Sequence, residues 1–220
     1  MIKLQRGDIV QDIPLFNTEN GIASLRLKEI PFFQTAYITI QSTLEERKLL
    51  DDCVGLCKAA GAERIYATCL KKAEYGDPIN IIRMARDLSS QEETDAMLFP
   101  VQQETLPLWR EIYNQKMRSV TGAAYMNDAM ARQLLAEKSG YFVHRNRELI
   151  GIGTACDDKI TVVASVQKGA GKDVVNALLS ALTNDRAIIE VAADNLKAIE
   201  LYSSLGFVAT GIVTSWYKII

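Results

Sequence analysis

The segment IIEVAADNLKAIELYSSLGF, from Ile188 to Phe207, decides which fold this chain can adopt. Its β-branched apolar start predicts a buried strand. Asn195 then stands where a helix cap is expected, and Ala198, Tyr202 and Leu205 recur at helical spacing. Gly206 ends the helix. The segment is therefore a strand followed at once by a helix that carries a tyrosine.

A second junction of this kind lies about twenty residues earlier, in ITVVASVQKGAGKDVVNALL (160–179). Gly169, Ala170 and Gly171 separate a strand from a helix, and glycine lets backbone approach a ligand closely. The free N–H groups of a first helical turn favour an anion, and Lys168 and Lys172 add positive charge. A phosphate or pyrophosphate is the expected ligand, although glycines at such a junction also form tight turns that bind nothing.

Two common phosphate motifs do not fit this loop. A P-loop requires Ser or Thr after the Gly-Lys pair, where Asp173 stands. A Rossmann fingerprint requires a third glycine where Val174 stands. Nucleoside triphosphates and NAD are therefore disfavoured.

Strands and helices alternate through the last 125 residues, which predicts a mixed α/β fold. Helices are expected in TLPLWREIYNQKM, in NDAMARQLLAEKSG (capped at Asn127 and closed by Gly140), in GKDVVNALLSAL and in NLKAIELYSSLG. Strands are expected in DAMLFPV, GYFVHRN, ELIGIGTAC, KITVVASV and AIIEVAA, and FVATGIV and TSWYKII are expected as two further strands. The three central strands form an antiparallel meander.

The first 95 residues carry weaker patterns. We expect strands in FFQTAYITI and ERIYATC, a helix in LEERKLLDDCVGLCKAAGA and a further helix in GDPINIIRMARDL. The polar stretch Asp87–Asp95 is the expected boundary, which gives domains 1–95 and 96–220. The strand-helix-strand rhythm of the first domain echoes residues 160–191, and a duplication is one explanation of it.

Composition limits the function classes. A net charge of −2 with acids and bases mixed along the chain disfavours nucleic acid and anionic membranes as partners. No signal peptide is expected in MIKLQRGDIV, and no apolar stretch reaches the ~20 residues of a membrane helix, so a cytoplasmic protein is expected. Cys53 and Cys57 are expected to be buried thiols rather than metal ligands, and no motif supports a nucleophile pair of Cys156 and His144.

The two junctions together resemble the GNAT superfamily of N-acetyltransferases over about residues 96–220. The resemblance is carried by Gly169-Ala170-Gly171 and by Asn195, Ala198, Leu201-Tyr202 and Gly206-Phe207. It implies a GNAT-like central mixed sheet flanked by helices, preceded by a partial GNAT-like α/β domain, and it implies acetyl-CoA as co-substrate without a metal.

The resemblance also implies roles for particular residues. Acetyl-CoA would pair with the backbone of a splayed strand at Val163, Ser165 and Val166, and its pyrophosphate would lie on Lys168 to Lys172. Asn195 would contact the acyl-pantetheine end. Tyr202 would protonate the departing thiolate while an amine attacks the thioester, whose oxygen a backbone N–H polarises.

Plainer explanations exist for several of these residues. Tyr202 fits a core position, Asn195 is a helix cap, and Glu190 suits either a base or a solvent-facing strand position. The glycine loop is about two residues shorter than the family pattern, with Val166 and Gln167 at its start. A non-catalytic acyl-CoA-binding or sensing module, or a structural protein with a dead site, is therefore an alternative to an enzyme.

The acceptor is expected to be a small-molecule or peptide amine, and a homodimer is left open. The resemblance places the acceptor pocket within about Trp109 to Met126, where Tyr125 is a candidate, while Trp109 and Tyr113 fit the core stripe. The corresponding junction of the N-terminal half reads QSTLEERK, with no glycine and with Glu45 and Glu46 at the helix start. Those carboxylates would repel a pyrophosphate, so this half is expected to be inactive.

Overall fold

A computed structural model describes residues 11–71, 73–88 and 94–220. Contacts divide the chain into two compact units. The first unit contains Met1–Asn80, Arg118–Tyr125 and Thr214–Ile220, and the second contains Ile81–Met117 and Met126–Val213. This division differs from the expected boundary at residue 95, because residues 81–88 belong with the second unit. Residues 89–93 of the expected linker, and residues 1–10, lie outside the described part.

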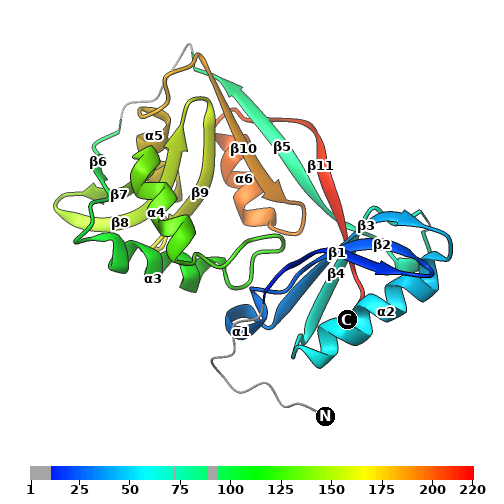
Figure 1. The fold of residues 1–220 in the computed structure, drawn as a ribbon. Coiled ribbons are helices and arrows are strands. Elements are labelled where there is room, and N and C mark those ends of the chain that lie inside the picture. Colours follow the sequence, from blue (N-terminus) through cyan, green and yellow to red (C-terminus); the bar gives the residue numbers. More distant parts are fainter. Residues whose placement is uncertain (1–10, 72, 89–93) are drawn as a thin grey trace. The chain divides into compact units, whose positions relative to one another are not determined.

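The first unit is a small sheet with one long helix packed on it (Figure 1). Strand β1 pairs antiparallel with β2, β2 antiparallel with β3, and β3 parallel with β4, while α2 connects β3 to β4 and packs on β2 and β3. Its elements are β1 (Ile13–Thr18), β2 (Gly21–Arg26), α1 (Ile30–Phe33), β3 (Thr35–Thr43), α2 (Glu46–Ala59), β4 (Arg64–Thr68) and the 3-10 turn η1 (Ala73–Tyr75).

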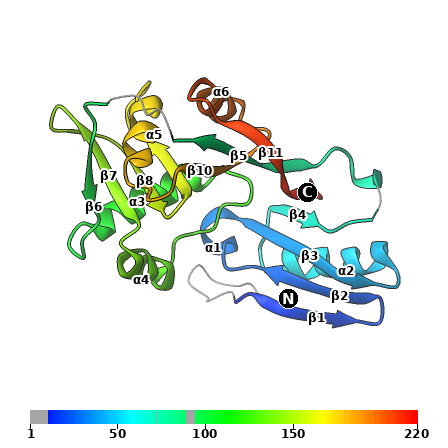
Figure 2. The same cartoon turned by 90° about the horizontal axis from the view of Figure 1, so that it is seen from above.

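The second unit is a larger sheet with helices on both sides (Figure 2). Strands β6 to β9 form an antiparallel series, and α5 leads from β9 to the parallel strand β10. Its elements are β5 (Ile79–Asp87), β6 (Met97–Pro100), α3 (Leu106–Met117), α4 (Asp128–Glu137), β7 (Gly140–Arg145), β8 (Glu148–Cys156), β9 (Lys159–Ser165), α5 (Gly171–Leu179), β10 (Arg186–Ala192), α6 (Leu196–Ser204) and β11 (Val208–Lys218).

The two units repeat one topology. Each has three antiparallel strands, a helix and then a parallel fourth strand: β1-β2-β3-α2-β4 in the first unit and β7-β8-β9-α5-β10 in the second. The predicted echo between the halves is therefore confirmed at the level of strand order. A duplication in the history of the chain remains a hypothesis.

The fourth strand of each series has a further antiparallel partner. In the sequence, that partner comes directly after the four strands of the other unit. Strand β5 comes after β4 but pairs antiparallel with β10, with Arg83 opposite Glu190. Strand β11 comes after β10, and its end pairs antiparallel with β4, with Tyr217 opposite Ala67. The antiparallel partner of each fourth strand thus comes from a distant part of the sequence.

Two predicted elements and one predicted helix end were wrong. Residues 79–87 form strand β5 rather than a helix, because β-branched isoleucines fit a strand that β10 completes. Residues 208–218 form one strand rather than two. Helix α4 ends at Glu137 with Lys138 in the left-handed region (φ 52°), so Gly140 does not close it but begins β7. The other predicted helices and the meander are confirmed, with Asn127 capping α4.

Two glycines of β8 bring α5 close to the sheet. A Cβ at Gly151 would lie 2.5 Å from Val174 Cγ2, and one at Gly153 would lie 2.3 Å from Leu178 Cδ1. Any larger residue would push α5 away. Because the glycine loop runs directly into α5, this close packing also fixes the position of the loop.

A buried carboxylate lies in the core of the first unit. The Glu29 side chain is 0% exposed, its nearest cation is Arg26 Nε at 3.6 Å, and neither carboxylate oxygen has a hydrogen bond with a described residue. Burial raises the pKa of Glu29 above its ordinary value. The folded chain therefore holds this proton more tightly than the unfolded chain does.

We expect Glu29→Gln to stabilise the chain by about 1 kcal/mol at neutral pH. Because the pKa of Glu29 is raised in the folded chain, the protonated carboxyl stabilises the fold. This contribution is complete below the ordinary pKa of Glu29 and is lost as the pH rises through the raised pKa. Urea unfolding should show a larger gain at pH 7 than at pH 5. The exposed Glu19→Gln serves as the control. An equal effect of both substitutions would contradict the assignment.

Candidate functional site

The site begins where β9 and β10 separate. They pair only at Ile188↔Lys159 and Ile189↔Ile160, after which they diverge (Figure 1). Residues 161–165 of β9 therefore have no strand partner on the β10 side, and Val163 and Ser165 lie on this free edge. Val166 follows the strand, and its N–H donates to Ile150 O at 2.9 Å. Unpaired backbone groups at an edge bind other amides readily.

In the described part of the first unit, the equivalent pair of strands does not separate in this way. These strands, β3 and β4, pair from Thr35↔Arg64 through Thr39↔Thr68. Glu46 stands in the first turn of α2, and Glu45 precedes it, paired with Lys48 at 2.8 Å. The contrast within one chain identifies the separation of β9 and β10 as a specific feature of the second unit.

The glycine loop closes one end of the opening. Gly169 has φ +85°, a conformation that favours glycine, and α5 begins at Gly171. The N–H groups of Lys168, Gly169 and Gly171 donate to no other described residue. Free amides at the positive end of a helix are groups that can bind an anion, which is the role predicted for this loop.

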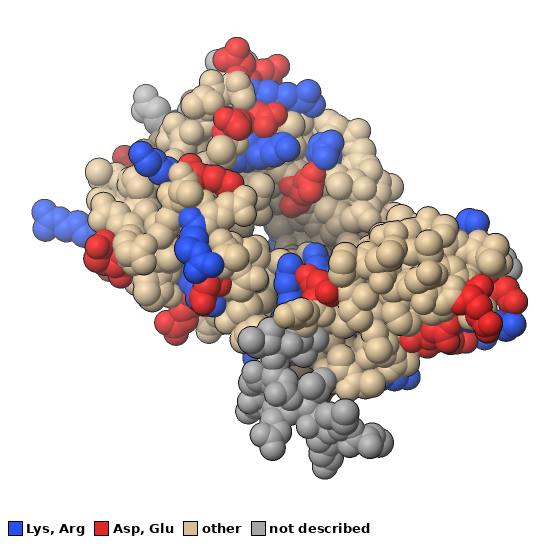
Figure 3. Space-filling view, viewed as in Figure 1, with Lys and Arg blue, Asp and Glu red and all other residues tan. Residues whose placement is uncertain are grey.

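Charge around the loop is net positive. Lys168 and Lys172 are exposed. Arg145, at the end of β7, pairs with Asp173 of the first α5 turn (Nη1–Oδ2 2.5 Å), so the one carboxylate at the helix start is neutralised. Sequence reasoning missed Arg145, which is far from the loop in sequence and belongs to no motif. Elsewhere, Figure 3 shows both signs of charge interspersed on the visible face.

Helix α6 lies close to the start of α5. A Cβ at Gly171 would lie 2.9 Å from Leu201 Cδ2 and 3.6 Å from Ser165 Oγ. A larger residue at Gly171 would therefore require the Leu201 side chain to move. The structure thus brings Ser165, the glycine loop and Leu201, the residue before Tyr202, close together, while the roles of the site residues stay predictions.

Tyr202 is buried on α6. Its side chain packs in the core of the second unit, with its ring centroid 6.0 Å from that of Phe207. Burial raises the pKa of Tyr202 to about 12, so the phenol stays protonated at neutral pH. Its hydroxyl makes no hydrogen bond with a described residue. A protonated phenol without a partner can donate to a ligand, while its ring also serves the core.

Asn195 caps α6, because its Oδ1 accepts a hydrogen bond from Ala198 N at 3.3 Å. The residue is exposed, so contact with a ligand stays a prediction.

Glu190 is exposed on β10 and forms an ion pair with Arg83 of β5 (Nη2–Oε1 2.9 Å). An exposed pair of this kind contributes little to stability. The ion pair does engage the Glu190 carboxylate, so Glu190 is a weaker candidate for the base that accepts a proton from the amine.

The predicted acceptor segment divides between the units. Trp109 is fully buried, stacks on Tyr113 at 5.5 Å and donates from Nε1 to Tyr141 O at 3.0 Å, which confirms both as core residues. Residues 118–125 belong to the first unit, where Tyr125 stacks on Phe32 at 3.5 Å. Tyr125 is thus part of an aromatic contact there.

Two of the four cysteines are buried, and Cys69 and Cys156 are exposed. Cys53 and Cys57 are fully buried, and burial raises their pKa values to about 12 and about 11, so the prediction of inert buried thiols is confirmed. The described residues contain no group of His, Cys, Asp and Glu suited to a metal ion. No helix within the described ranges is long and apolar enough to cross a membrane.

Comparison of the sequence with family models and with curated proteins gives no match. Solved structures match at low identity. A conserved protein of unknown function from Staphylococcus epidermidis is 13% identical with a TM-score of 0.57, and the match covers 99% of each chain. A putative acetyltransferase from Pyrococcus horikoshii is 12% identical with a TM-score of 0.54, covering 90% of this chain and 68% of that one.

A GCN5-related N-acetyltransferase from Sphaerobacter thermophilus is 11% identical, covers 90% and 76% of the two chains and reaches a TM-score of 0.48, which is too low to carry an argument. At such identities, likeness establishes the fold and nothing more. Together with the strand order of the second unit, the two matches with TM-scores above 0.5 show that the chain has a mixed α/β fold shared with the putative acetyltransferase from Pyrococcus horikoshii.

Proposed function

We propose that this chain is an N-acyltransferase that moves an acetyl group from acetyl-CoA directly to a primary amine of a small-molecule or peptide acceptor. The separation of β9 from β10, next to a glycine loop with free amides, is the observation that supports this most. It offers an amide-binding edge followed by an anion site, the order in which pantetheine and pyrophosphate occur in CoA.

The residues present fit this ligand. The free edge at Val163 and Ser165, with Val166 beyond it, would pair with the pantetheine amides. The N–H groups of Lys168, Gly169 and Gly171, with the Lys168 and Lys172 side chains, would hold the pyrophosphate, and Ala170, whose N–H donates to Gln167 O at 3.4 Å, would lie beside it. Asn195 would contact the acyl end. Acetyl-CoA supplies the thioester, and this chain's residues orient it.

Tyr202 is the proposed acid. The amine nitrogen bonds to the thioester carbon, the C–S bond breaks, and sulfur leaves with the bonding electron pair. The Tyr202 hydroxyl gives its proton to that sulfur and regains one from solvent, and the proton that the amine loses passes to solvent. A backbone N–H on the free edge would stabilise the carbonyl oxygen as its charge develops.

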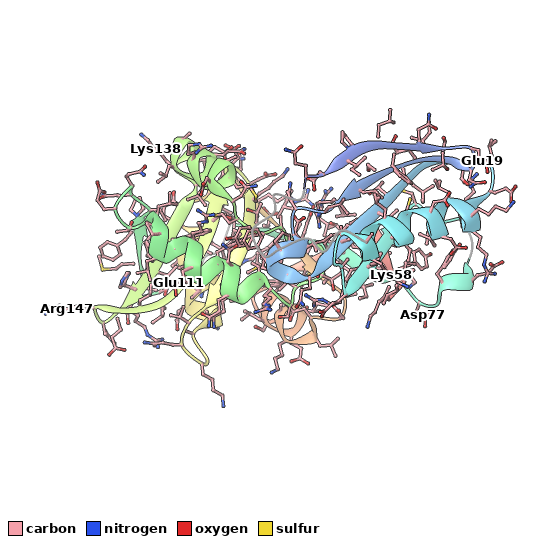
Figure 4. The ribbon with its side chains drawn as sticks, turned by 60° about the horizontal axis from the view of Figure 1, so that its bottom comes forward. Glu19, Lys58, Asp77, Glu111, Lys138 and Arg147 are labelled. Carbon is pink, nitrogen blue, oxygen red and sulfur yellow. The ribbon has the colours of Figure 1, made fainter. Side chains whose placement is uncertain are left out.

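Calorimetric titration of acetyl-CoA into the whole chain tests the binding step. We expect micromolar affinity, and Lys168→Gln should weaken it about threefold to tenfold, because a charge beside the pyrophosphate is lost. The effect should shrink at high salt. Lys58→Gln, which removes an exposed charge on α2 of the first unit (Figure 4), should leave the affinity unchanged.

Absence of acetyl-CoA binding would overturn the proposal and favour a structural protein with a dead site. Binding without turnover on a broad panel of primary amines would favour the sensing module, which the short glycine loop motivates. The first unit is proposed to be inactive, since its equivalent strands stay paired.

A further inference from the structure

A tight β-hairpin contacts the segment around the glycine loop. Its strands, β7 and β8, pair with Arg145 opposite Glu148. The two residues between them, Asn146 and Arg147, have φ values of 54° and 69°, as in the usual two-residue turn of a hairpin. Figure 4 shows Arg147 at the tip of this hairpin. Such a turn holds Arg145 and Glu148 in fixed positions opposite each other.

Both of these side chains bond to residues that flank the loop. The Arg145 guanidinium pairs with Asp173 in the first turn of α5. The Glu148 carboxylate accepts a hydrogen bond from Gln167 Nε2 at 3.0 Å, just before the glycines. The hairpin therefore places one cation and one carboxylate beside the two ends of the loop.

The Arg145–Asp173 pair adds little to the position of the loop. The N–H groups of Val166 and Gln167 both donate to Ile150 O, at 2.9 Å and 3.3 Å, which ties the start of the loop to β8. The close packing of α5 on β8 fixes its end. The pair is also partly exposed, at 39% for one side chain and 29% for the other, so it contributes little to stability. What the pair does determine is the charge at the start of α5.

The Asp173 carboxylate is the one acidic group of the first α5 turn. A carboxylate there is attracted by the same free N–H groups and the same positive helix end as a bound anion. Left unpaired, it would repel a pyrophosphate on the loop, while the ion pair with Arg145 cancels its charge. Lys168 and Lys172 then give the loop its net positive charge.

The first unit offers a contrast within the same chain. Glu46 stands in the first turn of α2, the helix equivalent to α5. Its Oε2 accepts a hydrogen bond from Lys71 N at 2.8 Å, and no Lys or Arg side chain among the described residues pairs with it. In the described part of the chain, a first-turn carboxylate is therefore paired with a cation in the unit whose strands separate and not in the other.

We propose that Arg145 is a positioning residue for acetyl-CoA, which acts through Asp173: it cancels the Asp173 charge and so allows the start of α5 to hold the pyrophosphate. This rests on the proposed function, because it concerns the same ligand at the same loop. Arg145 need not touch the ligand itself. The affinity should therefore follow the balance between the two charges rather than the presence of Arg145.

Calorimetric titration of acetyl-CoA into the whole chain and its variants tests this balance. Arg145→Gln leaves Asp173 charged and should weaken binding about fivefold to twentyfold, with a smaller effect at high salt. Asp173→Asn leaves Arg145 unpaired and should tighten binding about twofold to fivefold. The double variant has the net charge of the unmodified chain and should bind within about twofold of it.

Lys159→Gln is the matched control, because it removes an exposed charge at the opposite end of β9 from the loop. It should bind acetyl-CoA as the unmodified chain does. Urea unfolding of each variant checks the fold, which loss of a partly exposed ion pair should change little.

Three outcomes would overturn the proposal. A double variant as weak as Arg145→Gln would show that Arg145 contacts the ligand or supports the loop, rather than cancelling a charge. Unchanged affinity in Arg145→Gln would remove Arg145 from the site and leave the proposed function intact. No binding of acetyl-CoA by the unmodified chain would overturn both.

Discussion

Replacing Tyr202 with phenylalanine is expected to lower the rate of acetyl transfer by about 10²-fold or more, the usual contribution of a positioned general acid. The substitution removes one oxygen whose hydrogen has no acceptor among the described residues. It leaves the ring in the core beside Phe207. The fold and the affinity for acetyl-CoA should therefore be retained, and the loss should fall on kcat. Release of the CoA thiol measures the rate, and calorimetry measures the binding.

Tyr141→Phe is a matched control, because Tyr141 is partly buried against the same core. It should leave the rate unchanged. Equal turnover of Tyr202→Phe and the unmodified chain would remove Tyr202 from the mechanism and leave it as a core residue. A loss of acetyl-CoA binding in Tyr202→Phe would indicate a positioning role instead.

The pH profile carries a related expectation. Because burial places the pKa of Tyr202 at about 12, the phenol stays protonated below about pH 10. A fall in rate between pH 7 and pH 10 would therefore have to come from another group.

Local sequence predicted most elements of the second unit because their signals are local. Asn127 and Asn195 cap helices where expected, and the glycine loop joins a strand to a helix. Strand β5 was missed because its state depends on β10, more than a hundred residues away. A pattern within residues 79–87 cannot report on a partner that completes the sheet, so tertiary pairing overrode a helical reading.

The candidate site also contains features that a local sequence pattern cannot predict. Gly169 and Gly171 were singled out within the β9–α5 junction and Tyr202 within the β10–α6 junction, because each motif has fixed spacing inside one short segment. Arg145 reaches Asp173 from a different hairpin, and only the pairing of β7 with β8 brings it there. The separation of β9 from β10 also left no mark in composition, since both strands are rich in apolar residues. Only the pattern of strand pairing in the structure shows this separation.

The glycines of β8 lead to the second large effect. Gly153→Val should destabilise the second unit by about 3 kcal/mol, because a Cβ there would meet Val162 O at 2.7 Å as well as Leu178 Cδ1. The backbone oxygen cannot move without disturbing the β8–β9 ladder. Urea unfolding measures the loss, and hydrogen exchange should place it in α5.

Gly211→Val is the matched control, since it makes the same change in a strand of the second unit where an added Cβ meets nothing within 4 Å. It should be neutral or slightly stabilising, because valine suits an exposed strand better than glycine does. Similar unfolding midpoints for the two variants would show that α5 tolerates displacement. A displaced α5 would also carry the glycine loop with it, so Gly153→Val should weaken acetyl-CoA binding while Gly211→Val should not.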